Sequence, residues 1–547
     1  MASLALPLLY SIHESSPASN AHILDIETSV CLWRSIISSS LGETLFPYCQ
    51  WIKTLRLGNL YSLLEDFGRG GLNMNLRRSS HFGGPSLAGQ FFSPPLQNLD
   101  LRDQLRGAGT RLNVDDIVTK VGDMIIECIK TAADQQGKDV GLLSLEGPPR
   151  SRLDDVSREG ILTGWVTAGR LSRLTSLRVH DGSVLNSDLA RAIRENCPAF
   201  NEMYVLLDNC SEPTADLYPR ACYMCRGIKV DATLAGFFKD LAPNTLGSFT
   251  INSHNNIGEE AFKALVGHAQ SLKRLGLFSL TREAVSSLGH LSQCLKIENF
   301  SLEAATEARN LPWDESVYSE VVQWLQRCDH LVSLDFQNVP DGTKILSEVL
   351  KSPNIRLRTL NVKSEDFSPE LYQSLSSQTG LLQLAVRIVD EDVLEEGEER
   401  RDQLVDSICQ CHELRELETN ELLTIEQFTQ ITTALPTLEE IDLNGDLIDD
   451  SFLVPLLALP RLKAFTVFGP SSFSFQGILD FLGDLASDPS GQHEGFQLYL
   501  GDQVFESKFT PDEEKFLNDE MRLRFGGKLD VTYRADPDEL HESDFSD

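Results

Sequence analysis

Basic side chains are scarce in this chain. Its 547 residues include 48 Lys and Arg against 81 Asp and Glu, which gives a formal net charge of −33 at pH 7. Phosphate backbones and anionic membrane surfaces attract positively charged proteins, so we expect neither nucleic acid nor a membrane among the partners. The charge favours a protein target with a basic patch. A second interpretation is that the acidic surface only keeps the chain soluble.

Long apolar runs are also missing from the sequence. No stretch approaches the roughly 18 apolar residues that cross a bilayer. Residues 1–10 are apolar but have no basic leader and no convincing cleavage site, which argues against a secretory signal. The eleven cysteines are scattered along the chain. We therefore expect buried free thiols rather than a disulfide framework, and a cytoplasmic or nuclear location.

The common catalytic and metal-binding motifs do not occur. The chain has no phosphate-binding Gly-Lys loop, no Gly-x-Ser-x-Gly turn and no His-Glu-x-x-His helix. Cys222-x-x-Cys225 has the spacing of a zinc or redox site, but no second pair follows it at a suitable distance. Packed thiols are the simpler interpretation, and a four-cysteine site with Cys197 and Cys210 is the alternative. We predict a non-enzymatic protein with no cofactor and no metal site.

The histidines give no support for catalysis either. None pairs with another ligand type at helical spacing in a convincing way. Three lie at loop or helix-end positions, where we expect surface histidines: His254, His268 and His412.

A short apolar motif, Leu-x-x-Leu-x-Leu or a close variant, recurs along most of the chain. Most gaps between its central residues are 24 to 26 residues, and two are 33 or 34. These central residues, here called the anchors, are Phe249, Leu275, Phe300, Leu334, Leu360, Leu384, Leu417, Ile441 and Phe465. A fixed period in the twenties that carries this motif is typical of leucine-rich repeats.

One repeat shows the order of structural elements. Residues 438–443 alternate apolar and polar positions, as a half-buried strand does. Turn-forming residues follow at 445–450, residues 452–459 keep helical spacing, and Pro460 ends the helix. We therefore predict an α/β fold, a curved leucine-rich-repeat solenoid with parallel strands on the concave face and helices on the convex face.

The regularity of the motif divides the chain into segments. We predict an N-terminal helical segment (1–48), degenerate repeats with loop insertions (49–170), the regular solenoid (171–501), a C-terminal cap (502–534) and a disordered acidic tail (535–547). Within the degenerate repeats, residues 68–95 read as a mobile insertion and 146–150 as a loop. The acidic run at 390–399 reads as a solvated loop or a longer convex helix, with a basic docking site as the alternative.

The cap has clear local signals. Thr510, Pro511 and Glu513 form a capping box with proline at the first helical position. The helix should end near Phe525, before two glycines, and residues 528–533 could add an edge strand.

Part of the N-terminal region is similar to a known family. Residues 32–37 (LWRSII), 41–49 (LGETLFPYC) and 52–66 resemble the region just after the F-box in fungal F-box/leucine-rich-repeat proteins, as do Phe91-Phe92 and the later phrase at 196–198 (NCP). In that family the F-box docks onto the adaptor of a cullin-based (SCF) ubiquitin ligase, and the repeats select a target protein. About thirty residues precede Leu32, and they hold Ser15-Ser16-Pro17 instead of a set of amphipathic helices. We expect a missing or truncated F-box, with 1–48 as a possible remnant.

The repeats and the resemblance lead to one functional prediction. We predict a protein-binding repeat protein, the substrate-recognition component of a cullin-type ubiquitin ligase, and adaptor binding if an F-box is present. The alternative is a leucine-rich-repeat scaffold or adaptor with no ligase association. The predicted partner-binding residues are polar positions beside the strand anchors: Ser333, Asp335, Thr359, Asn361, Glu416, Glu418, Glu440 and Asp442.

Overall fold

The chain divides into two compact units, Met1–His268 and Ala269–Asp547, in a computed structural model. The residues it describes are 19–69, 114–136, 141–147, 160–168, 171–180, 184–206, 230–252, 257–305, 308, 313–364, 368–388, 398–444, 448–487, 493–503 and 508–533. Several predicted features lie outside these ranges: Phe91-Phe92, residues 70–95 of the insertion, Cys210, Cys222, Cys225, His254, most of the acidic run and the tail 535–547.

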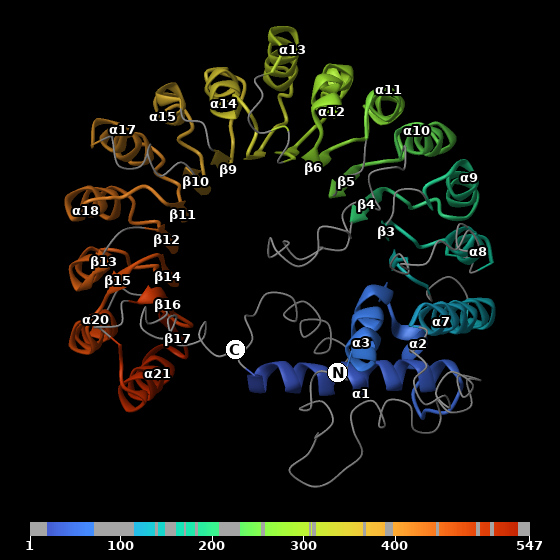
Figure 1. Cartoon of the computed structure of the whole chain (residues 1–547), viewed down its shortest axis with the longest axis horizontal. Coiled ribbons are helices and arrows are strands. Elements are labelled where there is room, and N and C mark those ends of the chain that lie inside the picture. The colour runs from blue at the N-terminus through green and yellow to red at the C-terminus, as the bar shows by residue number, and fades with distance from the viewer. Residues whose placement is uncertain are drawn as a thin grey trace, which may run out of the picture. The chain divides into compact units, whose positions relative to one another are not determined.

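The second unit contains a ladder of parallel strands. They are β6 (Arg274–Leu280), β7 (Asn299–Ala304), β8 (Ser333–Gln337), β9 (Thr359–Ser364), β10 (Gln383–Ile388), β11 (Glu416–Thr419), β12 (Glu440–Asn444), β13 (Ile448–Asp449), β14 (Ala464–Phe468), β15 (Ser471–Ser472), β16 (Gln497–Gln503) and β17 (Lys528–Tyr533). The strands line the inner side of this unit's curve, and its helices lie outside them (Figure 1). The prediction of a leucine-rich-repeat solenoid is confirmed.

The predicted anchors occupy equivalent positions in successive strands of this unit. Leu275 pairs with Phe300, which pairs with Leu334, and the series continues through Leu360, Leu384, Leu417, Ile441 and Phe465. Every one of them is at most 2% exposed. The alternation of the strands explains this, because every second side chain points toward the helices and its neighbours point away from them.

Helical segments between the strands of the second unit cover the anchors. These segments are α12 (Arg282–Ser286), η9 (Leu288–Gln293), α13 (Glu315–Gln326), α14 (Gly342–Leu350), α15 (Pro369–Leu375), α17 (Glu398–Ile408), α18 (Ile425–Ala434), η11 (Asp450–Phe452), α19 (Leu453–Leu456), α20 (Phe475–Ser487) and α21 (Pro511–Phe525). In α18, Thr424 and Gln427 form a capping box, and the ring of Phe428 stacks on that of Phe465, 6.3 Å away. The predicted helix at 452–459 is shorter than expected, because the chain forms η11 and α19 there.

The predicted C-terminal elements are present. Thr510 and Glu513 form the capping box of α21, and Gly526 ends the helix in the left-handed conformation with a φ of 66°. Strand β17 then pairs in parallel with β16, where Leu529 lies beside Leu498. The described part of the chain contains no helix that is both long enough and apolar enough to span a membrane.

The first unit has its own parallel ladder. Its strands are β1 (Thr54–Arg56), β2 (Ser144–Glu146), β3 (Ser176–Val179), β4 (Glu202–Leu206) and β5 (Ser248–Asn252). Its helices are α1 (Ser19–Ser40), α2 (Tyr48–Trp51), α3 (Leu57–Arg69), α7 (Val114–Gln136), α8 (Ile161–Ala168), α9 (Ser187–Asn196), α10 (Val230–Asp240), α11 (Glu259–Leu265) and η8 (Val266–His268). Equivalent apolar residues again match from strand to strand and lead to the anchor Phe249: Leu55, Leu145, Leu177 and Met203.

Strand β2 corrects one prediction. Glu146 was expected to begin a loop, but it ends β2 and lies beside Arg178 of β3. Its buried carboxylate accepts a hydrogen bond from the Gly58 N–H at 3.2 Å and lies 3.1 Å from His180 Nε2. A Cβ at position 58 would come within 2.4 Å of Glu146 Oε1, so the site favours glycine. The repeated motif is incomplete at β2, because Leu142 and Leu145 fit it but Gly147 stands at its last apolar position.

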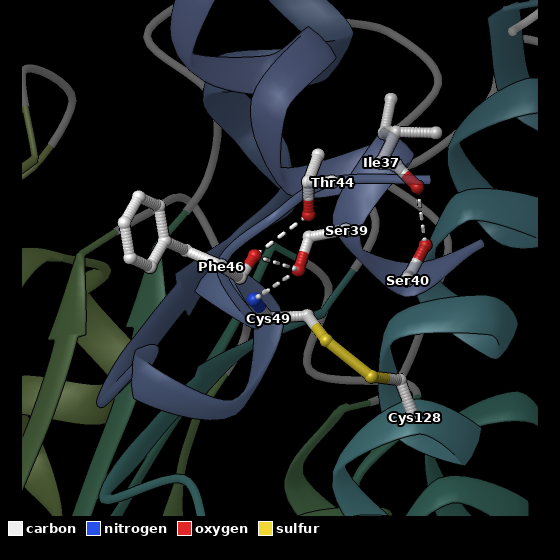
Figure 2. Close-up of a disulfide and its surroundings, with 7 residues drawn as sticks. All are labelled: Ile37, Ser39, Ser40, Thr44, Phe46, Cys49 and Cys128. Atoms are coloured by element: carbon white, nitrogen blue, oxygen red, sulfur yellow. Dashed lines mark hydrogen bonds between the residues drawn. A yellow bond between two sulfur atoms is a disulfide. The ribbon is translucent and has the colours of Figure 1, made fainter. Parts of the chain in front are cut away.

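A disulfide in the first unit corrects the expectation of free thiols. Cys49 of α2 is bonded to Cys128 of α7, 79 residues away along the chain (Figure 2). The Cys49 N–H donates to Ser39 Oγ at 3.1 Å, which also links α2 to the end of α1. The other described cysteines are free, and all but Cys31 are buried. Burial raises the pKa of the Cys197 and Cys294 thiols to about 12.

His268 also differs from its prediction, since it is completely buried. Its Nδ1 accepts the Thr245 N–H at 3.2 Å, and its Nε2 lies 3.1 Å from the Phe238 carbonyl oxygen. These contacts fit a neutral ring with the proton on Nε2. Burial lowers its pKa. His412, in contrast, is exposed as expected.

Candidate functional site

The candidate site is the side of strands β8 to β12 that faces away from the helices, here called the concave face. All eight predicted residues lie at alternate positions of β8, β9, β11 and β12 and keep part of their surface exposed. They form two groups of four. In one group Ser333 lies beside Thr359 and Asp335 beside Asn361, and in the other Glu416 lies beside Glu440 and Glu418 beside Asp442.

The first group is polar with a single acid. The Gln337 side chain donates to Asp335 Oδ1 at 3.1 Å. Burial raises the pKa of Asp335, although its hydrogen bonds with Gln337 and Ser301 oppose this shift. This part of the face therefore offers hydrogen-bonding groups that neighbouring strands already hold in place.

Strand β10 joins the two groups through residues that the sequence prediction left out. Gln383 Oε1 accepts from Thr359 Oγ1 at 2.9 Å, and Gln383 Nε2 donates to Glu416 Oε2 at 2.6 Å. Four residues further along the strand, on the same face, Arg387 forms an ion pair with Glu418. Both residues keep the period-two spacing of the predicted ones, so the alternation in residues 383–388 could have identified them.

The second group gathers four carboxylates on two neighbouring strands. Equivalent residues on neighbouring strands lie about 5 Å apart, so these charges repel one another. Burial raises the pKa of Asp442, and the charges of Glu418 and Glu416 raise it further. Burial also raises the pKa of Glu440, with added repulsion from Glu416 and Asp442. Thr466 and Arg387 lower the pKa of Asp442, but they only partly offset these effects.

Two aromatic residues continue the face beyond the carboxylates. Phe468 ends β14 beside Asn444 of β12, and its side chain is 43% exposed. Its ring centroid lies 5.6 Å from that of Tyr499 on β16. Both residues were left out of the predicted face because only polar positions beside the anchors were selected for it. The alternation from Phe465 and Val467 places Phe468 on the opposite side of the strand, which was the available signal.

The face carries hydrogen-bonding and charged side chains, and we find no catalytic arrangement among its described residues. Within the ranges that the structure covers, no three His, Cys, Asp or Glu side chains come together in a way that could hold a metal ion. A cavity of about 190 Å³ opens next to the face, between the ends of β11 and β12 and the helical segments that follow. Its lining includes the buried carboxylate of Glu421, which Tyr372 and Arg400 already engage at 2.7 and 2.8 Å.

Among known proteins, solved structures match this chain, but no protein family does. No family model matches the chain, and no curated protein matches it. A crystal structure of the yeast Rad7 and Elc1 complex covers 83% of this chain and 94% of its own matched chain, with 16% identity and a TM-score of 0.41. A crystal structure of a TLR13–ssRNA13 complex covers 73% of this chain and 56% of its own, with 12% identity and a TM-score of 0.29. The assignment of this chain to the leucine-rich-repeat solenoids rests on its own ladder of repeats.

Proposed function

We propose that the chain is a non-enzymatic protein-binding protein whose concave face holds a partner protein. The observation that carries this proposal is the continuous row of part-exposed polar side chains from β8 to β12, which Gln383 and Arg387 join into one surface. Four carboxylates on β11 and β12 raise the energy of the free protein through their mutual repulsion. A partner with Lys or Arg side chains would relieve that repulsion on binding, so a basic patch is the expected complement.

We further propose that the partner is a substrate delivered to a cullin-type ubiquitin ligase. The support is the resemblance of residues 32–66 to the region after the F-box in fungal F-box/leucine-rich-repeat proteins. In the structure this segment comprises the second half of α1, together with α2, β1 and most of α3. A leucine-rich-repeat scaffold or adaptor without ligase association is the second candidate, because no family model supports the F-box family for this chain.

The partner face is tested by charge reversal. The double variant Glu418→Lys, Asp442→Lys should weaken capture of the partner, and rising salt should weaken capture by the unmodified chain in the same direction. Glu418→Lys also leaves Arg387 opposite a like charge, so a milder Glu418→Gln, Asp442→Asn variant should give a smaller loss. The matched control is Glu413→Lys, Glu494→Lys, which makes the same charge change at exposed residues outside the strands. Unchanged capture by the double variant would remove this face from the proposal.

The ligase role is tested separately from the partner face. The full chain would be affinity-captured from its own cells, and the bound proteins identified by mass spectrometry. A cullin adaptor that co-purifies with the chain and a target supports the ligase role. A target captured without the adaptor supports the scaffold.

A further inference from the structure

We infer that Phe468 and Tyr499, with the neighbouring carboxylate of Asp442, form a binding site for an arginine side chain of a basic partner segment. This inference rests on the proposed function, because it places the partner on the same concave face. It goes further by naming the contact that orients the partner and the residue type that makes it.

The first observation is the exposed aromatic pair. The Phe468 ring does not enter the core formed by Phe465 and Val467, both of which are fully buried. It lies on the concave side at an angle of 48° to the ring of Tyr499, with 5.6 Å between the centroids. The two rings thus present adjoining apolar faces at the end of the polar row.

The second observation is the position of the Asp442 carboxylate. Asp442 lies beside Thr466, and Thr466 lies beside Tyr499, so the three occupy one row across β12, β14 and β16. Phe468 is one strand from Asp442 and two residues further along. With about 5 Å between strands and about 3.3 Å per residue, their Cα atoms are about 8 Å apart. A flat cation resting on the Phe468 ring can reach toward the Asp442 carboxylate across this distance.

Charge complementarity selects the occupant. An apolar partner side chain on the rings would bring low-dielectric material beside Asp442 without neutralising its carboxylate, which costs free energy. The pKa of the Asp442 carboxyl is already raised by burial and by Glu418 and Glu416, and Arg387 only partly offsets this, so this carboxylate lacks sufficient positive charge in the free protein. A cation over the rings would supply that charge.

The rings favour arginine over lysine. A guanidinium is planar, stacks on aromatic faces and donates two parallel hydrogen bonds to a carboxylate. A lysine ammonium is a compact, strongly hydrated charge that gains less from the ring. The carboxylates alone would attract arginine and lysine alike. The effect of the aromatic pair should therefore be measurable as a preference for arginine over lysine.

The experiment measures this preference with two synthetic peptides of equal length, one alternating arginine and glycine and the other lysine and glycine. We expect the full chain to bind the arginine peptide about fivefold more tightly at physiological salt. Phe468→Leu, which keeps an apolar side chain but removes the ring, should bring the two affinities together by weakening the arginine peptide only. Tyr499→Phe keeps the ring face and should keep the preference. Circular dichroism and the thermal midpoint would check that each variant folds.

The outcomes separate this inference from the proposed function. Equal affinity of the unmodified chain for both peptides, or a preference that survives Phe468→Leu, would overturn the arginine site. Absence of binding to either peptide would overturn it as well. In each case the Glu418 and Asp442 variants still decide, through capture of the partner, whether the concave face binds protein.

Discussion

Glu418 and Asp442 lie directly beside each other on strands β11 and β12, with both side chains on the concave face. Arg387 pairs with Glu418 from the other side, on β10. One cation thus lies at the edge of a group of four carboxylates. Its charge lowers the pKa of Asp442 but does not offset burial and the neighbouring acids. Such an arrangement stabilises the free protein poorly, which is a reason to seek its role in binding.

The first prediction concerns the stability of the unbound protein. Because the pKa of Asp442 is raised in the folded chain, the folded state binds this proton more readily than the unfolded state. Stability therefore falls as the pH rises from the unfolded pKa, about 3.9, through the folded one. Asp442→Asn should stabilise the chain at pH 7 by about 0.2–1 kcal/mol, the size of one like-charge contact across a ladder.

Thermal unfolding at pH 7 and near pH 3 would check this prediction. The gain should shrink at the lower pH, where the carboxyl is protonated in both states. Glu413→Gln is the control, since Glu413 is exposed and outside the strands. A loss of stability in Asp442→Asn at pH 7 would contradict our account of the four carboxylates.

The second prediction concerns the core of the ladder. Leu360, Leu417 and Ile441 are each at most 2% exposed and occupy matching positions. Truncation of any one to alanine should cost roughly 2–5 kcal/mol, because the rigid repeat cannot fill the cavity. Denaturant unfolding measures the cost. Thr359→Ala, at the neighbouring concave position, should cost far less, and near-zero losses at all three anchors would disprove the register.

The third prediction concerns His268, whose pKa is lowered by burial. The folded chain therefore binds a proton at this histidine more weakly than the unfolded chain does. The contribution of His268 to stability is fully present above about pH 6.5 and is lost as the pH falls. The slope from this one group is at most about 1.4 kcal/mol per pH unit. His268→Gln should make the thermal midpoint depend less on pH between pH 5 and pH 7. This range spans the ordinary histidine pKa. His412→Gln, at an exposed site, should leave the profile unchanged.

The fourth prediction concerns the Cys49–Cys128 disulfide, which closes a long loop between α2 and α7. Peptide mapping without reductant should recover the two cysteines in one cross-linked fragment. Cys49→Ser should lower the unfolding free energy of the oxidised protein by about 2–4 kcal/mol, and added reductant should remove most of this difference. Cys31→Ser, which changes an exposed free thiol, is the control and should have no effect.

The disulfide also anchors an exposed aromatic cluster. The rings of Phe46, Tyr48 and Trp51 lie within 6.2 Å of one another, and each is at least 39% exposed. Tyr48 and Trp51 belong to α2, the same short helix that carries Cys49. The sequence marked this segment only by its resemblance to the F-box family. That the three rings cluster and stay exposed is seen only in the folded chain.

The sequence by itself determined the repeat, the strand positions from Leu275 to Phe465 and which side chains face away from the helices. It could do so because each repeat contacts mainly its neighbours and a strand alternates strictly, so a local pattern fixes both the period and the face. Only the tertiary structure decided the pairing of Cys49 with Cys128, the burial of His268 and the meeting of Phe468 with Tyr499. These contacts join residues 23 to 79 positions apart, and they depend on how helices and neighbouring strands pack, which no local period encodes.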